Sequence, residues 1–179
     1  MVRSMDDNIE IHTFLYFAYG SNLLKERLQL KNPSASIHCV ARLKDYKLIF
    51  GNYKGLASDR WHGGVATIEN SPADEVWGVV WRMNVADLES LDSQENVRLG
   101  AYSPVEVNVK TRGQELNCRT YIMNSCIYAP PSPQYLKVTH LLLHSFPPPF
   151  YLSLYHTLNV VNESGALYGY TVEDEEKCK

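Results

Sequence analysis

The stretch FLYFAYGSNLLKERL, residues Phe14 to Leu28, sets the expected fold of this chain. Its first six residues, Phe14 to Tyr19, are apolar or aromatic, and such a run is typical of a fully buried strand. Leucines then recur at positions 23, 24, 28 and 30, a spacing that favours a short helix. Asn22 stands where the N-cap of that helix is expected.

A Gly-Ser-Asn turn joins the predicted strand to the predicted helix, and its position indicates a binding role. Gly20 allows backbone angles that other residues resist, and it lets a ligand approach the chain closely. Unpaired N–H groups at a strand-to-helix turn form a ready site for an anion or an oxyanion. The alternative is an ordinary turn with an asparagine cap, and the segment Tyr19–Asn22 alone is too short to decide between the two.

Short strands dominate the sequence that follows. Runs of β-branched and aromatic residues predict strands at 36–43, 46–50, 64–68, 75–83, 102–111 and 116–123. Ser71 and Pro72 are expected to form the turn between two of these strands, and Asn84 is expected to cap a second short helix. Many strands with few helices indicate an α+β fold: a small mixed β-barrel with short helices on its outside.

The composition is that of an ordinary globular protein. Of the 179 residues, 45% are hydrophobic and 21% are charged, which suits one domain with its own core. The net charge of −3, without a cluster of lysines and arginines, argues against nucleic acid or an anionic membrane as a partner. The polar N-terminus lacks the apolar segment of a secretory signal, so we expect a cytosolic protein with reduced thiols.

The cysteines do not indicate a metal or redox centre. They stand at 39, 118, 126 and 178, and no two of them form a C-x-x-C pair. Cys39 and Cys118 lie in apolar, strand-like runs, so we expect them to pack as small buried hydrophobic residues.

Glu95 is the candidate catalytic residue that the pattern singles out. It follows Leu88 by seven positions and Leu91 by four, so it shares the apolar stripe of the second predicted helix. Burial raises the pKa of a carboxyl group, and a raised pKa suits a proton acceptor near neutral pH. The alternative is that Glu95 points to solvent from the last helical turn. Asp92, at the edge of the stripe, is a weaker rival, and His62 is either a second acid or base or a plain loop histidine.

Several segments in order along the chain together resemble the gamma-glutamylcyclotransferase family. They are FLYFAYGSNLL, NPSAS, CVARLKDYKL, WHGG-ATI, DEVWGVVW-MN, SLD-QE-V and APPSPQY, and they extend from Phe14 to Tyr135. The resemblance implies a barrel-like α+β fold and a reaction without a cofactor. In that reaction the substrate's α-amine attacks its own γ-carbonyl group, 5-oxoproline forms, and a free amino acid leaves.

The resemblance also implies a set of site residues. Glu95 aligns with the family's general base and acid. The implied substrate-binding residues are Tyr16, Phe17, Ala18, Tyr19, Gly20, Ser21 and Tyr135. The resemblance implies no metal ion. Asn22 after the Tyr-Gly-Ser motif favours the gamma-glutamyl amino acid type over relatives that act on glutathione or gamma-glutamyl-lysine. The family is cytosolic, takes part in glutathione metabolism and forms homodimers, and we expect the same here.

The resemblance stops near residue 135, which divides the chain into three expected parts. Residues 1–12 are a disordered lead-in, residues 13–135 are the cyclotransferase-like domain, and residues 136–179 are a divergent C-terminal segment of uncertain order. This segment, rich in aromatic residues and proline, leaves two functions open. One is an active cyclotransferase, and the other is an inactive binding or interaction protein derived from the family. A small-molecule carrier is a third reading.

Overall fold

The computed structural model describes residues 11–137. The lead-in predicted for residues 1–12 and the divergent segment predicted for residues 136–179 therefore lie almost entirely outside the described residues. At the start of the described part, the carbonyl of His12 accepts a hydrogen bond of 2.9 Å from the N–H of Val85.

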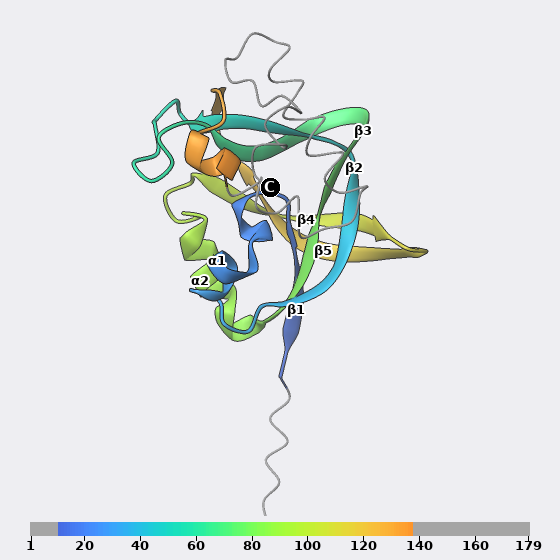
Figure 1. Cartoon of the computed structure of the whole chain (residues 1–179). Helices are drawn as coiled ribbons and strands as arrows, with labels where there is room; N and C mark the ends of the chain where they lie inside the picture. The colour runs from blue at the N-terminus through green and yellow to red at the C-terminus, as the bar shows by residue number, and fades with distance from the viewer. Residues whose placement is uncertain (1–10, 138–179) are drawn as a thin grey trace, which may run out of the picture.

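Five strands close into a barrel (Figure 1). They are β1 (Thr13–Ala18), β2 (Ser36–Tyr53), β3 (Val65–Asn84), β4 (Tyr102–Thr111) and β5 (Gln114–Met123). Their order is β3-β1-β5-β4-β2, and the pairing of β2 with β3 closes the ring. β1 and β5 are parallel, whereas the other pairs are antiparallel. A short strand, β6 (Cys126–Tyr128), extends β2. The predicted small mixed barrel with short helices is confirmed.

The two longest strands correct the sequence prediction. The runs 36–43 and 46–50 belong to one strand, β2, and the runs 64–68 and 75–83 belong to one strand, β3. The predicted turn at Ser71 and Pro72 is wrong, because the register changes there from the pair Lys44–Glu75 to the pair Tyr46–Asn70. This irregularity bends both strands without ending them, and bent strands are what a small closed barrel needs.

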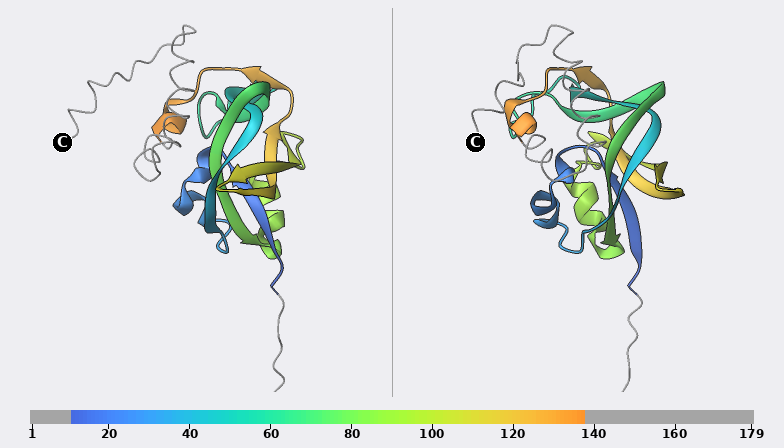
Figure 2. Two further views of the ribbon diagram at one scale, coloured as in Figure 1. Left: turned by 90° about the vertical axis from the view of Figure 1, so that its right-hand side faces the viewer. Right: turned by 45° about the vertical axis from the view of Figure 1, so that its right-hand side comes forward.

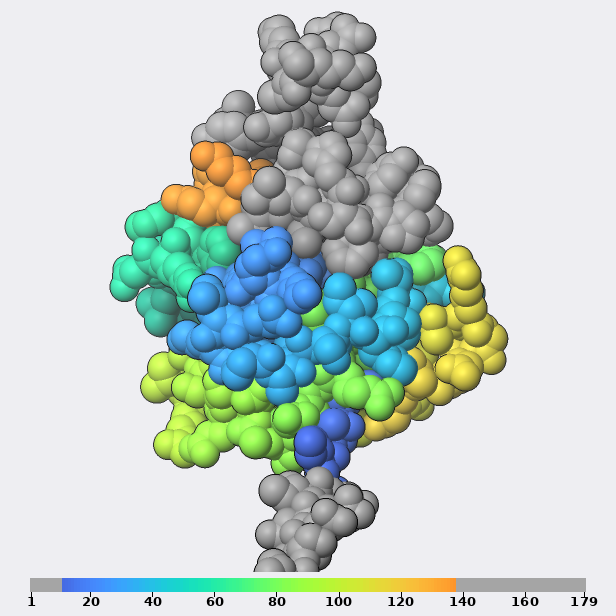
Figure 3. Space-filling model, turned by 60° about the horizontal axis from the view of Figure 1, so that its bottom comes forward, coloured from blue at the N-terminus to red at the C-terminus, as the bar shows by residue number. Residues whose placement is uncertain are grey.

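The helices are short and lie outside the barrel (Figures 1 and 2). After β1 come a 3₁₀ turn, η1 (Ser21–Leu23), and α1 (Lys25–Gln29), and after β3 come η2 (Val85–Asp87) and α2 (Leu88–Gln94). In Figure 3 the blue surface around α1 lies against the green surface around α2. Between the two regions, Ser90 Oγ donates to the carbonyl of Lys31 at 2.8 Å.

The N-cap predicted at Asn22 is wrong, whereas Asn84 is found at the N-cap position as predicted. Gly20 occupies the cap of η1, and Asn22 lies inside that turn. The Asn22 amide is therefore directed away from the helix terminus and into the protein. Asn84 precedes η2, although its side chain makes no capping hydrogen bond.

The core has two parts, one on each side of β1. Because side chains alternate along a strand, Phe17 packs in one part, while Tyr16 and Ala18 pack in the other. The first part fills the barrel and includes Leu43, Ile68, Val80, Val109 and Cys118. The second lies between the barrel wall and the helices and includes Leu23, Leu28, Trp81, Met83 and Leu91. Cys118 is buried as predicted, and Cys39 is partly buried.

Candidate active site

A cavity of about 290 Å³ opens where the turn after β1 meets the end of α2. The loop between β2 and β3 and the segment 130–137 complete its wall. These two segments are hydrogen-bonded, because the N–H of Ser132 donates to the carbonyl of Gly64 at 2.9 Å. Figure 1 shows this contact as the orange segment beside the teal loop. The cavity therefore combines parts of the chain that are more than 100 residues apart.

Glu95 lies in this cavity, immediately after the last residue of α2. Its Oε1 accepts a hydrogen bond of 2.9 Å from Asn22 Nδ2, which also donates to the hydroxyl of Tyr16 at 3.1 Å. Burial is the main cause that raises the pKa of Glu95, with a smaller contribution from Asp92. Arg27 and the Asn22 amide oppose that shift, and the resulting pKa is about 7. The carboxylate is thus close to half-protonated at neutral pH.

A chain of amides fixes the orientation of Asn22. Asn32 Nδ2 donates to Gln94 Oε1 at 2.9 Å, and Gln94 Nε2 donates to Asn22 Oδ1 at 2.8 Å. With its oxygen engaged by Gln94, Asn22 can present only its NH₂ group to Glu95. These hydrogen bonds therefore favour the ionised form of Glu95 and hold it at one position.

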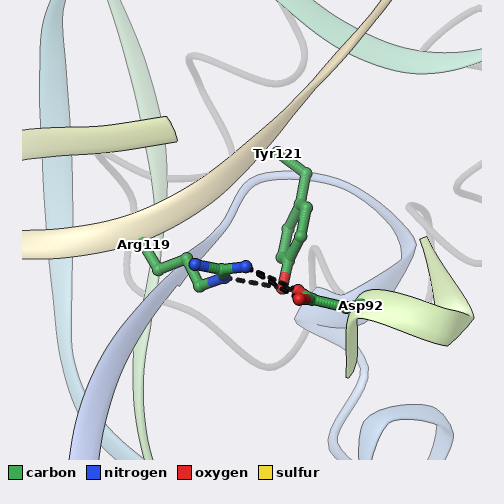
Figure 4. A network of polar contacts seen from close by, with 3 residues as sticks. All are labelled: Asp92, Arg119 and Tyr121. Carbon is green, nitrogen blue, oxygen red and sulfur yellow. Dashed lines mark hydrogen bonds and ion pairs between the residues drawn. The ribbon is translucent and has the colours of Figure 1, made fainter. Parts of the chain in front are cut away.

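Asp92, the weaker rival in the sequence, has a different environment (Figure 4). Its two oxygens accept hydrogen bonds of 2.7 and 2.9 Å from Arg119 Nη2, and one of them also accepts from the Tyr121 hydroxyl at 2.5 Å. Asp92 does not line the cavity, whereas Tyr121 does. The charge of Asp92 is therefore paired with a neighbouring cation, and its oxygens are engaged outside the cavity.

Gly20 and Ser21 contact Tyr135 at the entrance to η1. The N–H of Ser21 donates to the Tyr135 hydroxyl at 2.8 Å. A Cβ atom on residue 20 would lie 2.3 Å from that hydroxyl oxygen, so only glycine allows the approach. Burial raises the pKa of Tyr135, which keeps the phenol protonated and able to donate its own hydrogen. The Ser21 N–H, which the sequence predicted to bind a ligand, is thus hydrogen-bonded to a side chain from the other end of the domain.

The structure brings together most of the predicted site residues. Those that line the cavity are Tyr16, Tyr19, Gly20, Ser21, Glu95 and Tyr135. Phe17 and Ala18 do not line it, because Phe17 is buried in the barrel and Ala18 in the core beneath the helices. His62 is an exposed loop residue outside the cavity, with a positive φ of 55°.

Sequence reasoning missed several residues of the cavity. These are Arg27, Asn52, Arg60, Trp61, Tyr102 and Tyr121. A tyrosine in a buried strand is a usable signal, because its hydroxyl needs a partner. The Tyr102 hydroxyl donates to the carbonyl of Ala66 at 2.9 Å, and the Tyr19 hydroxyl donates to the carbonyl of Tyr121 at 2.5 Å. No comparable signal marks the loop residues.

Neither a metal centre nor a membrane-spanning helix is present between residues 11 and 137. Within that range, no three His, Cys, Asp or Glu side chains are placed to hold a metal ion together. The helices described there are all too short or too polar to cross a bilayer.

Comparison with known proteins agrees with this fold. Residues 75–141, which include the second half of β3, α2, β4 and β5, match the AIG2-like family. Gamma-glutamylcyclotransferase from Mus musculus is 62% identical over 130 residues, which cover 72% of this chain and 69% of that relative. The protein of the same name from Homo sapiens is 61% identical over 127 residues, which cover 70% and 68%.

A solved structure gives the same result at the level of the fold. A gamma-glutamyl cyclotransferase superposes with a TM-score of 0.78 at 47% identity, and the match covers 94% of this chain and 100% of the other. The chain therefore belongs to the gamma-glutamylcyclotransferase family. The predicted family and the predicted kind of enzyme are both confirmed.

Proposed function

We propose that this chain converts a gamma-glutamyl amino acid to 5-oxoproline and the free amino acid, with Glu95 as general base and then general acid. One observation carries the proposal. The Glu95 carboxylate lies in a cavity bordered by Gly20 and Ser21, and its pKa is raised to about 7. The names of the relatives give the same activity, gamma-glutamylcyclotransferase.

Glu95 begins the reaction by taking a proton from the substrate's α-ammonium group, whose ordinary pKa is about 7.7–8.0. The freed amine attacks the γ-carbonyl carbon of the same glutamyl residue, and a five-membered ring with a tetrahedral carbon forms. Glu95 then returns its proton to the leaving nitrogen as the C–N bond breaks. The attacking nitrogen still carries one extra proton, which passes through Glu95 to the released amine, so that the products are the neutral lactam and an ammonium group. A carboxyl group with a pKa of about 7 can accept and release this proton at little cost.

The Tyr135 hydroxyl is the donor that we assign to the developing oxyanion. It accepts a hydrogen bond from the Ser21 N–H, which polarises the phenol and orients its own O–H. A well-placed donor of this kind contributes on the order of 10² to 10³ in rate. In this proposal the backbone of the Gly20–Ser21 turn acts through Tyr135 and not as a direct donor to the substrate.

Orientation supplies much of the remaining rate. The nucleophile belongs to the substrate itself, so the cavity has only to hold the glutamyl arm in a curled conformation. Good orientation in an intramolecular reaction is worth about 7–11 kcal/mol. Tyr16 and Tyr19, both almost fully buried, give the cavity a rigid wall for this task. A homodimer and a cytosolic location stay predictions from the resemblance.

Replacing Glu95 tests the proposal directly. We expect Glu95→Gln to reduce 5-oxoproline release from gamma-glutamyl-alanine by about 10²- to 10⁴-fold, because a general base contributes that much. The matched control is Asp92→Asn, the same change three residues earlier, which we expect to retain turnover within about tenfold. Circular dichroism of both variants checks that the fold is intact. Full turnover by a folded Glu95→Gln variant would rule out Glu95 as the base.

The same assay separates the alternatives that the sequence left open. An inactive binding protein or a carrier binds gamma-glutamyl-alanine without releasing 5-oxoproline. Turnover of about 1 to 10³ per second by the full chain, the usual range for enzymes, would exclude both.

A further inference from the structure

Two arginines lie together on one tryptophan in the cavity. The guanidinium carbon of Arg27, on α1, is 5.0 Å from the centre of a ring of Trp61, and that of Arg60 is 5.9 Å from it. Arg27 is half-buried, whereas Arg60 is exposed. All three side chains line the cavity, and Trp61 in turn packs on Tyr135 with ring centroids 5.0 Å apart.

The Glu95 carboxylate attracts Arg27 electrostatically, but neither guanidinium group has a carboxylate within ion-pair distance in the described part of the chain. Between residues 11 and 137, neither arginine forms an ion pair or a hydrogen bond. Arg27 Nε is fully buried and meets no acceptor among those residues. Burial and, to a smaller extent, the charge of Arg60 lower the pKa of Arg27, so the charged form of Arg27 is destabilised at this position. An unpaired buried donor is costly, and an anion at this point would remove the cost.

We propose that Arg27 and Arg60 bind the α-carboxylate of the amino acid that leaves, so that this chain selects gamma-glutamyl compounds with a free terminal carboxylate. The assignment rests on the proposed function. A guanidinium group presents its N–H donors in a planar fork that matches a carboxylate. Trp61 orients both guanidinium groups by cation–π contact, which limits the side-chain entropy lost when a ligand binds.

The position of the arginines favours the leaving amino acid over the glutamyl half of the substrate. The reacting amine must reach Glu95, which Asn22 holds by a hydrogen bond and which is less exposed than Arg60. Arg60 is exposed and therefore lies at the mouth, through which the product amino acid departs. A neutral leaving group would place no negative charge between the two cations. The glutamyl half has an α-carboxylate too, and the substrates below distinguish the two.

Binding to the Glu95→Gln variant tests this inference without turnover. We compare gamma-glutamyl-alanine, its alaninamide analogue, and an analogue with a carboxamide in place of the glutamyl α-carboxylate. Titration calorimetry should give a dissociation constant about 10- to 100-fold higher for the alaninamide than for the acid, the loss expected for a charge-assisted contact. Adding Arg60→Gln or Arg27→Gln should weaken the binding of gamma-glutamyl-alanine but not that of its alaninamide analogue, which reduces the preference to about threefold or less.

Arg98→Gln is the matched control, because Arg98 is 91% exposed, pairs with Glu89 across 3.4 Å and does not line the cavity. It should leave the preference unchanged. Arg60 is exposed, so Arg60→Gln should fold even if Arg27→Gln does not.

Three outcomes would overturn the inference. They are equal binding of acid and alaninamide, a preference that survives both arginine changes, or loss of the arginine effect only with the glutamyl α-carboxamide. The last would assign the arginines to the other carboxylate. Failure of the proposed function gives a different result, since wild-type chain would then release no 5-oxoproline whatever these dissociation constants are.

Discussion

Asp92 and Glu95 lie three residues apart at the end of α2, and their carboxylates have opposite surroundings. Asp92 accepts hydrogen bonds from a guanidinium group and a phenol, whereas among residues 11–137 the hydrogen-bond donor to Glu95 is the neutral amide of Asn22. The first arrangement compensates a charge and joins α2 to β5. The second leaves the charge of Glu95 without a paired cation, and the pKa of Glu95 is raised to about 7. The two carboxylates are close in sequence, but the hydrogen-bond and ion-pair partners of each one decide what it can do.

The largest effect on stability should come from removing the ion pair between Arg119 and Asp92. Arg119→Met removes the cation from Asp92 and leaves its charge and the Tyr121 hydroxyl in a partly buried position. We expect a loss of about 1–3 kcal/mol in the free energy of unfolding, which is below the value for fully buried pairs because the side chains are 22% and 30% exposed. Urea denaturation at pH 7 measures the loss. Arg98→Gln, at an exposed pair, should change the stability by less than about 0.5 kcal/mol.

A second change should stabilise the protein while it destroys the proposed activity. The pKa of Glu95 is about 7 in the folded chain, whereas the ordinary value of 4.5 applies to the unfolded chain. As the pH rises between these values, the unfolded chain ionises Glu95 more readily, so the folded state loses stability. Glu95→Gln removes that cost. At pH 8 we expect a gain of about 1–2 kcal/mol, less than the full shift implies because the side chain keeps some solvent contact.

The sign of this effect can be checked with pH. Below about pH 4.5 Glu95 is protonated in both the folded and the unfolded chain, so the advantage of Glu95→Gln should vanish there. Thermal or urea unfolding of both proteins at about pH 3.5, one unit below the ordinary pKa, and at pH 8 gives the comparison. An advantage that stays constant over this range would mean that the charge of Glu95 does not limit stability.

The smallest effect should come from reversing the direction of the hydrogen bonds that run from Gln94 through Asn22 to Glu95. In Gln94→Glu the new carboxylate can only accept, so Asn22 turns its NH₂ group toward residue 94 and its oxygen toward Glu95. The lost donor and the added charge both raise the pKa of Glu95. We expect the acid limb of kcat/KM, near pH 7 in the wild type, to rise by about 0.5–1 pH unit.

Other charged and titratable groups face Glu95 and should be unchanged by that substitution. They are Arg27 on α1, Asp92 on α2, Tyr16 and Tyr19 from β1 and the turn after it, and Tyr102 and Tyr135. Gln94→Met is the control, because it removes the amide without adding charge and should shift the limb less. An acid limb at the same pH in Gln94→Glu would contradict the role assigned to the amide chain.

Local patterns in the sequence predicted much of the fold. The strand at Phe14–Tyr19 is found one residue earlier, as β1, and the strands predicted at 102–111 and 116–123 correspond to β4 and β5. The errors arose where a strand bends. A polar Ser-Pro pair usually marks a turn, but the pairing of β2 with β3 continues on both sides of it and carries the chain onward. Such long-range pairing has no local signature.

The candidate site was predictable only in part, for a related reason. Periodicity placed Glu95 on the core side of its helix, and the structure puts its carboxylate in the cavity. Asn22 looked like a cap because its neighbours are local, whereas its real partners, Glu95 and Gln94, are more than 70 residues away. Arg60 and Trp61 stand in a loop without periodicity, so nothing in their spacing connects them to the site. Closing the barrel is what brings these segments together.

The contact between Gly20 and Tyr135 makes the cavity depend on complete folding. One partner follows the first strand, and the other comes after the last, at a distance of 115 positions along the chain. A nascent polypeptide therefore has no finished wall until every strand is in place. Product formation can in this way serve as a reporter of correct assembly, and a substitution anywhere in the barrel that delays the final docking step should appear first as lost catalysis in freshly refolded protein.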